Sequence, residues 1–384
     1  MTHVNNDPGQ PTPSSGNKYN IISYLKVEYR RNTLFYLILF VLLLYTTIKC
    51  IISGETLTPF VTKYTIRAVR FILLCASITS IVWLLAFFRH DCSLAEYTRR
   101  TWKHVSAYAF NARIRKALLG VIIFTAIMAP FLYWKMKIPH LNPFSWDQTF
   151  AIWDSQLFFG RQAWEILLPV FENHPALTRA IDGMYLFWMF VCYAFFCGLL
   201  LSDSRRVQNL RSQYWLATIL SWIIIGLVAA TALSSAGPIY FEAVTGDGQT
   251  YGPLVEYLRS FGSQQGSGSS GNLQAINTAN HLWDVYTGAV NAPAGISAMP
   301  SMHNAQALLF CLAAFRIRLW FGLLMTLYAA IILVGSVHLA WHYFVDGIVA
   351  YAMVLPIWHF SGWVLNRKQN AVPVLKDHAR TNTH

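Results

Sequence analysis

Apolar residues gather in long runs along the chain, and short polar or basic segments separate these runs. A helix needs about 20 predominantly apolar residues to cross the hydrocarbon core of a bilayer. Seven runs reach or approach this length, and a shorter eighth run covers residues 301–315. The pattern predicts an all-α integral membrane protein with about eight transmembrane helices. The seven longer runs cover residues 34–53, 69–89, 117–134, 183–201, 214–232, 319–337 and 344–365.

The runs divide the chain into four parts. Residues 1–33 are polar and have no apolar stretch before a cleavage site, so they indicate a disordered cytoplasmic tail and not a signal peptide. Residues 34–116 would hold two N-terminal transmembrane helices and a basic inner loop. Residues 117–365 would form a six-helix catalytic membrane domain, and residues 366–384 a cytoplasmic tail.

Composition agrees with a membrane protein, because 55% of the residues are hydrophobic and only 12% are charged. The net charge of +12 alone would allow nucleic-acid binding. With residue 1 in the cytoplasm and eight crossings, however, 20 of the 29 Lys and Arg residues fall on the inner side. This is the positive-inside pattern. We expect both termini in the cytoplasm, a place in a bacterial inner membrane or its equivalent, and no nucleic-acid partner.

The stretch "AMPSMH", Ala298–His303, directly precedes the apolar run at 301–315. Proline is favoured in the first turn of a helix, so a helix is predicted to begin at or near Pro300. The free N–H groups at a helix start attract anions such as phosphate. Ser301 adds a hydroxyl donor, and His303 can transfer a proton near neutral pH. This stretch indicates a phosphate-binding helix start.

A second stretch, "HYFVD", follows the return of the chain across the membrane. His342 and Asp346 are four residues apart, so on a helix their side chains share a face and can form a hydrogen bond. A carboxylate bonded to one ring nitrogen leaves the other nitrogen free as a nucleophile. Because two crossings lie between His303 and His342, both are predicted at the same, non-cytoplasmic face.

Together the two stretches favour phosphoryl transfer. His342 would be the nucleophile, Asp346 its orienting acid, His303 the proton donor and Ser301 a phosphate ligand. Such chemistry through a phosphohistidine requires no metal or other cofactor. One alternative is that His338, His342 and Asp346, spaced by four, bind a metal. Another is that the two stretches are unrelated polar helix ends.

A segment between the third and fourth runs mixes aromatic side chains with Asp147, Asp154, Arg161 and Glu165. Interfacial helices that anchor in the membrane surface have this composition. The functional alternative is that Arg161 or one of the acids faces a substrate head group.

"MPSMH" and "HLAWHYFVDG" resemble the second and third signature motifs of the type 2 phosphatidic acid phosphatase superfamily. With "SAGPIYF", they look closest to its inositol phosphorylceramide synthase branch. The resemblance covers roughly residues 115–365. It implies a six-helix membrane core, an active site at the periplasmic or lumenal face, and the same roles for His342, Asp346, His303 and Ser301.

Two basic positions of this superfamily are missing. The first motif, a Lys followed seven residues later by Arg-Pro, has no match, and Ser336 stands where the third motif usually has Arg. The transferase branch also lacks these positions. Another cation has to bind the phosphate, and Arg161 is preferred because it lies in the aromatic and acidic interfacial segment. Further candidates are Lys135, Lys137 and Arg259. His338 is predicted as a substrate contact.

These observations predict a phosphotransferase that moves an inositol phosphate-like head group. Its partners would be a phospholipid donor and a lipid or glycan alcohol as acceptor. The alternatives are a phosphatase acting on a lipid phosphate or polyprenyl diphosphate and, as a non-enzyme, a transporter or metal-binding membrane protein.

Overall fold

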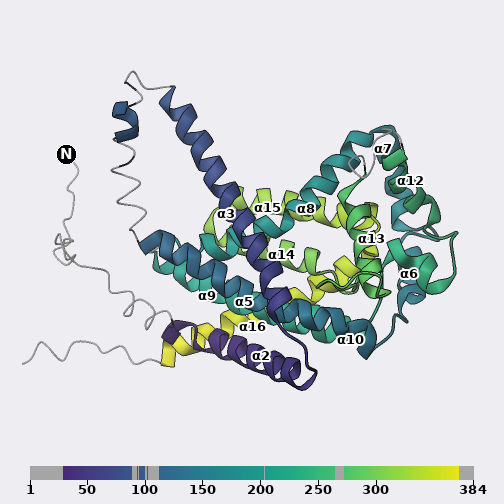
Figure 1. The fold of residues 1–384 in the computed structure, drawn as a ribbon, viewed down its shortest axis with the longest axis horizontal. Helices are drawn as coiled ribbons and strands as arrows, with labels where there is room; N and C mark the ends of the chain where they lie inside the picture. The colour runs from purple at the N-terminus through teal and green to yellow at the C-terminus, as the bar shows by residue number, and fades with distance from the viewer. Residues whose placement is uncertain are drawn as a thin grey trace, which may run out of the picture.

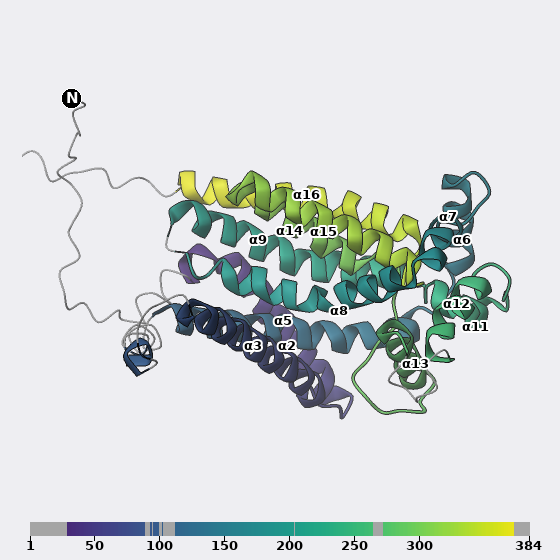
Figure 2. The same ribbon diagram turned by 90° about the horizontal axis from the view of Figure 1, so that it is seen from above.

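Long helices run alongside one another, and shorter helices cover one end of the bundle (Figures 1 and 2). The computed structural model describes residues 29–88, 93, 95–99, 102, 112–202, 204–263 and 272–371. Within these ranges the regular structure is helical, without a strand. The predicted all-α fold is confirmed.

The long helices account for the apolar runs. They are α2 (Thr33–Ile52), α3 (Thr58–Phe87), α5 (Ala112–Leu141), α8 (Pro175–Gly198), α9 (Arg205–Ile223), α14 (Met302–Ile317), α15 (Leu319–His338) and α16 (Phe344–Ala371). A π-helical segment, η1 (Ile224–Ala229), and the short α10 (Ala230–Ala232) extend α9.

The shorter helices come from the segments that join α5 to α8 and α10 to α14. They are α6 (Asp147–Leu157), α7 (Ala163–Asn173), η2 (Pro238–Tyr240), α11 (Phe241–Thr245), α12 (Gly252–Ser263) and α13 (Gln274–Tyr286). Figure 2 shows α6, α7, α11, α12 and α13 gathered at the end of the bundle where α8 begins. We call this the capped end.

Seven helical segments of the described chain are long and apolar enough to cross a membrane, so the chain is an integral membrane protein. They are Thr33–Ile52, Thr58–Phe87, Arg115–Leu141, Pro175–Gly198, Arg206–Ala232, Leu319–His338 and Phe344–Arg367. The predicted eighth, α14, has 16 residues and is shorter than these. It lies against α15, α16 and α9, in the middle of the bundle.

The largest difference from the predicted spans concerns α3. The sequence pattern placed the second span at 69–89, but the helix begins at Thr58 with Pro59 in its first turn. Proline favours a helix start there, since its missing N–H has no helical partner to lose. Lys63 and Arg67 consequently lie on a membrane helix, whereas the predicted span began only after them.

Helix α3 packs on the bundle along one narrow stripe. Its buried residues are Phe60, Tyr64 and Ala68, which repeat every four positions and therefore share one face. This stripe contacts α5 and α8. Most other side chains of α3 are exposed and apolar, as expected for a helix that faces lipid.

Candidate active site

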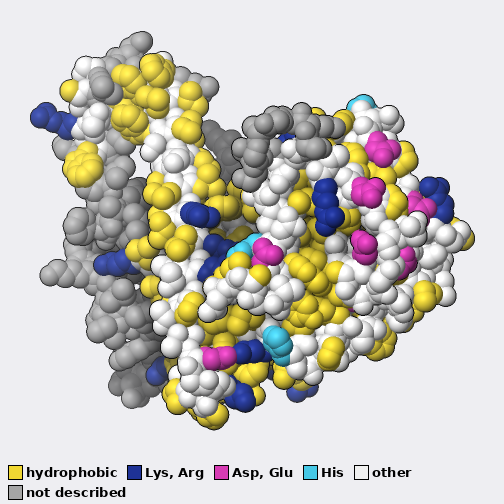
Figure 3. Space-filling view, turned by 45° about the vertical axis from the view of Figure 1, so that its right-hand side comes forward, with side chains coloured by type: hydrophobic (Ala, Val, Ile, Leu, Met, Phe, Trp, Pro, Cys, Tyr) yellow, Lys and Arg dark blue, Asp and Glu magenta, His cyan; other side chains and the backbone are white. Residues whose placement is uncertain are grey.

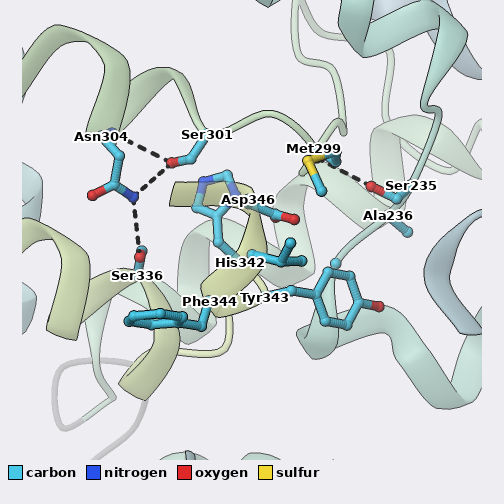
Figure 4. Close-up of polar contacts among 12 residues, drawn as sticks. Ser235, Ala236, Met299, Ser301, Asn304, Ser336, His342, Tyr343, Phe344 and Asp346 are labelled. Atoms are coloured by element: carbon cyan, nitrogen blue, oxygen red, sulfur yellow. Dashed lines mark hydrogen bonds and ion pairs between the residues drawn. The ribbon is translucent and has the colours of Figure 1, made fainter. Parts of the chain in front are cut away.

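The first motif forms the start of α14, close to the prediction. Ser301 is the N-cap residue, and its hydroxyl accepts a hydrogen bond from the Asn304 N–H at 3.4 Å. The Asn304 side-chain amide also donates to the hydroxyls of Ser301 and Ser336, at 3.0 and 3.3 Å (Figure 4). Ser301 has no exposed surface. Its hydroxyl is therefore engaged in capping the helix.

The second motif brings His342 and Asp346 together. His342 Nδ1 lies 3.0 Å from Asp346 Oδ2. The predicted pair exists, although His342 lies in the turn between α15 and α16 and not on a helix. The N–H of His342 donates to the Ser336 carbonyl at 2.9 Å, and Ala340 has a left-handed φ of 59°. The conformation of this turn, in addition to the four-residue spacing of His342 and Asp346, orients the imidazole ring towards the carboxylate.

The two motifs are joined directly. The Ser301 N–H donates to the backbone carbonyl of Asp346 at 3.3 Å, so the start of α14 is fixed to the first turn of α16. Figure 4 shows Ser301, Asn304 and Ser336 on one side of the His342 ring, with Asp346 beside it. Ser301 and Asp346 are 45 positions apart in the sequence, and their contact brings the two motifs into one site.

Asp154 of α6 fixes the start of α16. Its two carboxylate oxygens accept the N–H groups of Phe344 and Val345 at 2.7 and 2.8 Å. A carboxylate at this place binds N–H groups that have no partner within the helix. Asp154 is 2% exposed. Asp154 is therefore not an acid that faces a substrate head group. Its carboxylate binds the backbone beside His342.

Asp147 has a related role in the neighbouring loop. Its carboxylate accepts N–H groups of Ala236 and Gly237 and, at 2.7 Å, the hydroxyl of Tyr343. Asp147 is also buried, at 2% exposure. It connects the "SAGP" segment, residues 235–238, to the residue after His342. Asp147 and Asp154 therefore position the site without lining the cavity.

His303 is held between aromatic rings of α8. Its ring stacks on Tyr185 with 4.3 Å between centroids, and the Trp188 ring lies 4.2 Å away on a tilted plane. The indole N–H of Trp188 donates to the His303 carbonyl at 3.2 Å. The His303 ring centroid is 6.0 Å from that of His342. His303 lies at the start of α14 and His342 follows the end of α15, and the two imidazoles approach each other as predicted.

Both histidines line one cavity of about 390 Å³. Ligand pockets in proteins commonly have volumes of this order. Aromatic and aliphatic side chains form most of the wall, including Phe131 of α5, Trp188 of α8 and Trp222 of α9. The cavity also contains basic side chains, which are Lys63, Arg67, Arg70 and Lys135. It can therefore accept a molecule with an apolar part and an anionic group.

The π-helical segment η1 brings Gly226 to the wall. A Cβ at this position would lie 2.8 Å from the Phe131 ring and 3.1 Å from the Met302 sulfur. The close approach of η1 to the start of α14 thus requires glycine. π-Helical turns of this kind are frequent at functional sites.

The electrostatic environment keeps His342 neutral. Burial, together with the positive charge of Lys135, lowers the pKa of the His342 imidazole from its usual value near 6.5 to about 3, although the Ala298 carbonyl acts in the opposite direction. The imidazole is unprotonated at physiological pH. With the hydrogen on Nδ1, it donates to Asp346 and has a lone pair on Nε2, as a nucleophile requires.

The three predicted substrate ligands, Ser301, Arg161 and His338, are not among the residues that line the cavity. The Arg161 side chain is 59% exposed and pairs with Glu165 at 3.6 Å, and Arg161 is not among the residues that line the cavity. The His338 ring stacks on Phe171 with 3.6 Å between centroids, and its Nε2 lies 3.0 Å from the Thr178 hydroxyl. His338 therefore serves the packing of α15 against α7 and α8.

The metal alternative for His338, His342 and Asp346 is contradicted. Helix α15 ends at His338 and α16 begins at Phe344, so the spacing of four does not place the three on one helix face. Among the described residues, no group of three or more His, Cys, Asp or Glu side chains could hold a metal ion.

Comparison with known families agrees with this geometry. A family model described as the PAP2 superfamily matches residues 148–360, which is more than half of the 384-residue chain. The chain belongs to the PAP2 superfamily. No curated protein and no solved structure matches it.

The PAP2 match covers both motifs and every helix from α6 to most of α16. Membership in the PAP2 superfamily supports a phosphatase- or phosphotransferase-type activity on lipid phosphates. Helices α2, α3 and α5 lie before the matched region. The four basic residues of the cavity all belong to α3 and α5, so they lie outside the PAP2 match.

Sequence reasoning missed Arg67 and Arg70 as site residues, and also Tyr185 and Trp188. A signal for the cations was available, because Lys63, Arg67 and Arg70 have the spacing of a helix face. This spacing was overlooked because the second span was expected to start only at residue 69. The aromatic residues carried no signal, since aromatic side chains are common throughout membrane helices.

Proposed function

We propose that this protein transfers a phosphate-linked head group, inositol phosphate-like, from a phospholipid to an alcohol of a lipid or glycan. His342 is the nucleophile. The observation that carries the proposal is the placement of a His342–Asp346 pair opposite His303 in one cavity that also contains cations and apolar walls.

The first step forms a bond between His342 Nε2 and the phosphorus atom of the donor. The bond from phosphorus to the lipid oxygen breaks, and that oxygen takes a proton from His303. Asp346 stabilises the positive charge that develops on the His342 ring. The anionic phosphate beside His303 favours the protonated form of that imidazole, which the step requires.

The second step returns His342 to its starting state. The acceptor hydroxyl gives its proton to His303 while its oxygen forms a bond to phosphorus, and the bond from Nε2 to phosphorus breaks. Splitting one displacement into two in this way avoids a single difficult transition state. The product is a new phosphodiester on the acceptor.

The second candidate function is hydrolysis of a lipid phosphate or polyprenyl diphosphate, with water as acceptor. The superfamily match supports both chemistries. We favour transfer because aromatic and aliphatic side chains make up most of the cavity wall, which suits a lipid alcohol better than water. The basic residues of the first and third signature motifs are absent from this sequence, as they are from the transferase branch.

We place the capped end, and with it the site, at the periplasmic or lumenal face. The support is the charge pattern of the sequence, in which most Lys and Arg residues would then lie on the cytoplasmic side. A cysteine-accessibility experiment on residues at α6 and at the end of α16 would test this orientation in intact cells.

The test of the mechanism is covalent trapping. Purified protein is mixed with a phospholipid that carries radioactive phosphorus and is quenched in alkali, where a phosphohistidine bond survives, before acid treatment, which cleaves it. Wild-type protein should retain label that acid releases. His342→Ala and His342→Gln should retain none, while melting as the wild type does.

His281→Ala is the matched control, because His281 is exposed on α13 and is not among the cavity residues. It should carry label like the wild type. Label on His342→Gln would reject the nucleophile, and a wild type without label or product would favour a transporter. Adding alcohols then distinguishes the two enzymes, because a transferase makes new lipid products and a phosphatase releases free phosphate.

A further inference from the structure

The cavity contains positive charge from a helix that the family match does not include. Lys63, Arg67 and Arg70 are spaced by four and three along α3, so they lie on one face of that helix. All three line the cavity that holds His303 and His342, together with Lys135 of α5. Figure 3 shows dark blue Lys and Arg side chains in the hollow on this side of the molecule.

A charged side chain on a membrane helix costs free energy unless an opposite charge or polar groups bind it. Helix α3 is apolar, with a mean hydropathy of 2.1 in its most apolar window. Arg67 lies nine positions from the start of the helix, which corresponds to about 14 Å along its axis. Ionisable residues within membrane helices are rare and mark sites of function.

None of the four cations is paired with a carboxylate of the described residues. Lys63 donates to the Pro293 carbonyl at 2.6 Å, and the Arg67 guanidinium lies 5.1 Å from the centre of the Tyr64 ring. Lys137, only two residues from Lys135, is by contrast paired with Glu55. An unneutralised set of cations in a cavity is the arrangement expected for an anionic ligand.

Among the described residues, Asp182 is the one carboxylate in the cavity wall, and it does not neutralise these charges. Asp182 accepts the backbone N–H groups of Gln274 and Ala275 at 2.7 and 2.9 Å. Its oxygens therefore hold the start of α13 and are directed to that backbone.

The positive charges act where a reacting phosphate would have to lie. The charge of Lys135 influences both the His303 and the His342 imidazoles, and the charge of Arg67 influences His303. Charged groups several ångströms apart in a poorly solvated cavity interact more strongly than in water. Lys63 is engaged with the Pro293 carbonyl and Arg70 is exposed, so the geometry also favours Arg67 and Lys135 as the cavity cations that serve the histidine pair.

The position of the missing arginine has been filled differently. Ser336, which stands there, is fully buried, and its hydroxyl accepts a hydrogen bond from Asn304. Asn304 in turn accepts one from the Tyr351 hydroxyl at 3.2 Å. Ser301, Asn304 and Ser336 are fully buried and none of them lines the cavity, so the phosphate ligands have to come from other residues of the cavity wall.

We propose that α3 completes the active site, with Arg67 of α3 and Lys135 of α5 binding the phosphate group of the lipid substrate between His303 and His342. Lys63 holds the loop at Pro293 over the cavity, and Arg70 lies further along α3 towards the lipid. This role rests on the proposed function, since it concerns the phosphate of the same substrate. It gives the second N-terminal helix, α3, a place in the enzyme.

The experiment measures binding of inorganic phosphate to the purified full-length protein by calorimetry in a phosphate-free detergent. Wild-type protein should bind phosphate saturably. A hydrogen bond to a charged group contributes about 1.5–3 kcal/mol, so Arg67→Gln and Lys135→Gln should each weaken binding by about 10- to 100-fold. Arg67→Lys should recover part of the loss, because it restores the charge without the guanidinium fork.

Lys137→Gln is the matched control, because its side chain pairs with Glu55 and is not among the cavity residues. Its phosphate affinity should equal that of the wild type. Unchanged affinity in Arg67→Gln and Lys135→Gln would overturn the proposal, as would a wild type that does not bind phosphate. Melting curves without phosphate check that each variant is folded.

Failure of the proposed phosphate site can be distinguished from failure of the proposed transfer reaction. Phosphate binding that depends on Arg67, in a protein that forms no phosphohistidine, would retain the binding site and reject the transfer reaction. Histidine labelling and turnover at wild-type rates in Arg67→Gln would retain the reaction and reject the role of α3.

Discussion

The imidazole rings of His303 and His342 lie 6.0 Å apart between centroids, with their planes inclined at 61°. In a near-attack arrangement the nucleophile lies about 3 Å from the reacting atom. The proton donor lies within a hydrogen bond, also about 3 Å, of the leaving oxygen. Both imidazoles are therefore near enough to contact the same phosphoryl group in the cavity. The separation suits a nucleophile and an acid that act on opposite bonds of the same phosphorus.

The role of His303 can be tested through the leaving group. We expect His303→Gln to slow labelling of the enzyme by about 10²- to 10⁴-fold when the donor releases an ordinary alcohol. The loss should be much smaller with a p-nitrophenyl phosphodiester, because nitrophenolate leaves without a proton. Single-turnover rates with the two donors measure this difference. Equal losses with both donors would contradict a proton-donor role.

Asp346 should affect turnover far more than binding. Asp346→Asn replaces the carboxylate with a group of nearly the same size that can favour the wrong tautomer of His342. Comparable changes in catalytic triads lower kcat by about 10⁴-fold. We expect a large loss in kcat with little change in KM, since Asp346 is fully buried and is not among the cavity residues. A wild-type kcat in this variant would count against the pairing.

The pH profile should reflect the buried position of His342. Its pKa is lowered to about 3, mainly by burial, so the free enzyme keeps the neutral nucleophile as the pH falls below 6.5. For a phosphodiester donor, whose own charge is constant here, kcat/KM should not decrease between about pH 7 and pH 5. The measurement is initial rate against pH at low substrate concentration. A loss of activity with an apparent pKa near 6.5, assigned to His342, would show that the ring is better solvated than the structure indicates.

Gly237 supports the turn that carries His342. Its φ is 99°, and a Cβ there would lie 2.7 Å from the Trp341 carbonyl oxygen. Gly237→Ala should therefore displace the turn and reduce kcat/KM strongly. Gly246→Ala is the matched control, because its φ is also positive, at 79°, but no atom lies within 4 Å of the added Cβ. Both variants should lose some thermal stability from backbone strain, and only Gly237→Ala should lose most of its activity.

Much of the fold follows from sequence alone. Runs of apolar residues determine the spanning helices, because a helix buried in lipid satisfies its own backbone groups and needs only length and hydrophobicity. The sequence spacing and the number of crossings also predicted the pairing of His342 with Asp346 and the nearness of His303. The described structure contains both features, although His342 lies in a turn and not on the helix that this spacing assumed.

Other features depended on how helices far apart in sequence meet. Nothing in the local pattern shows that Asp154 binds the start of α16, or that the ring of His303 stacks on Tyr185. Arg161 had the right charge and a suitable segment, yet its side chain points to Glu165 at the exposed surface. Charge and composition identify candidates, but the direction of a side chain depends on its neighbours in three dimensions.

The sequence by itself determined the membrane helices, the two motifs and the paired histidine, because periodicity and hydrophobicity act within one segment of chain. Only the tertiary structure decided which cations face those histidines. Arg67 and Lys135 are 68 residues apart and belong to different helices, and they share a cavity because α3 packs on α5 through Phe60, Tyr64 and Ala68. Helix packing, which depends on the shapes of both partners, set that arrangement.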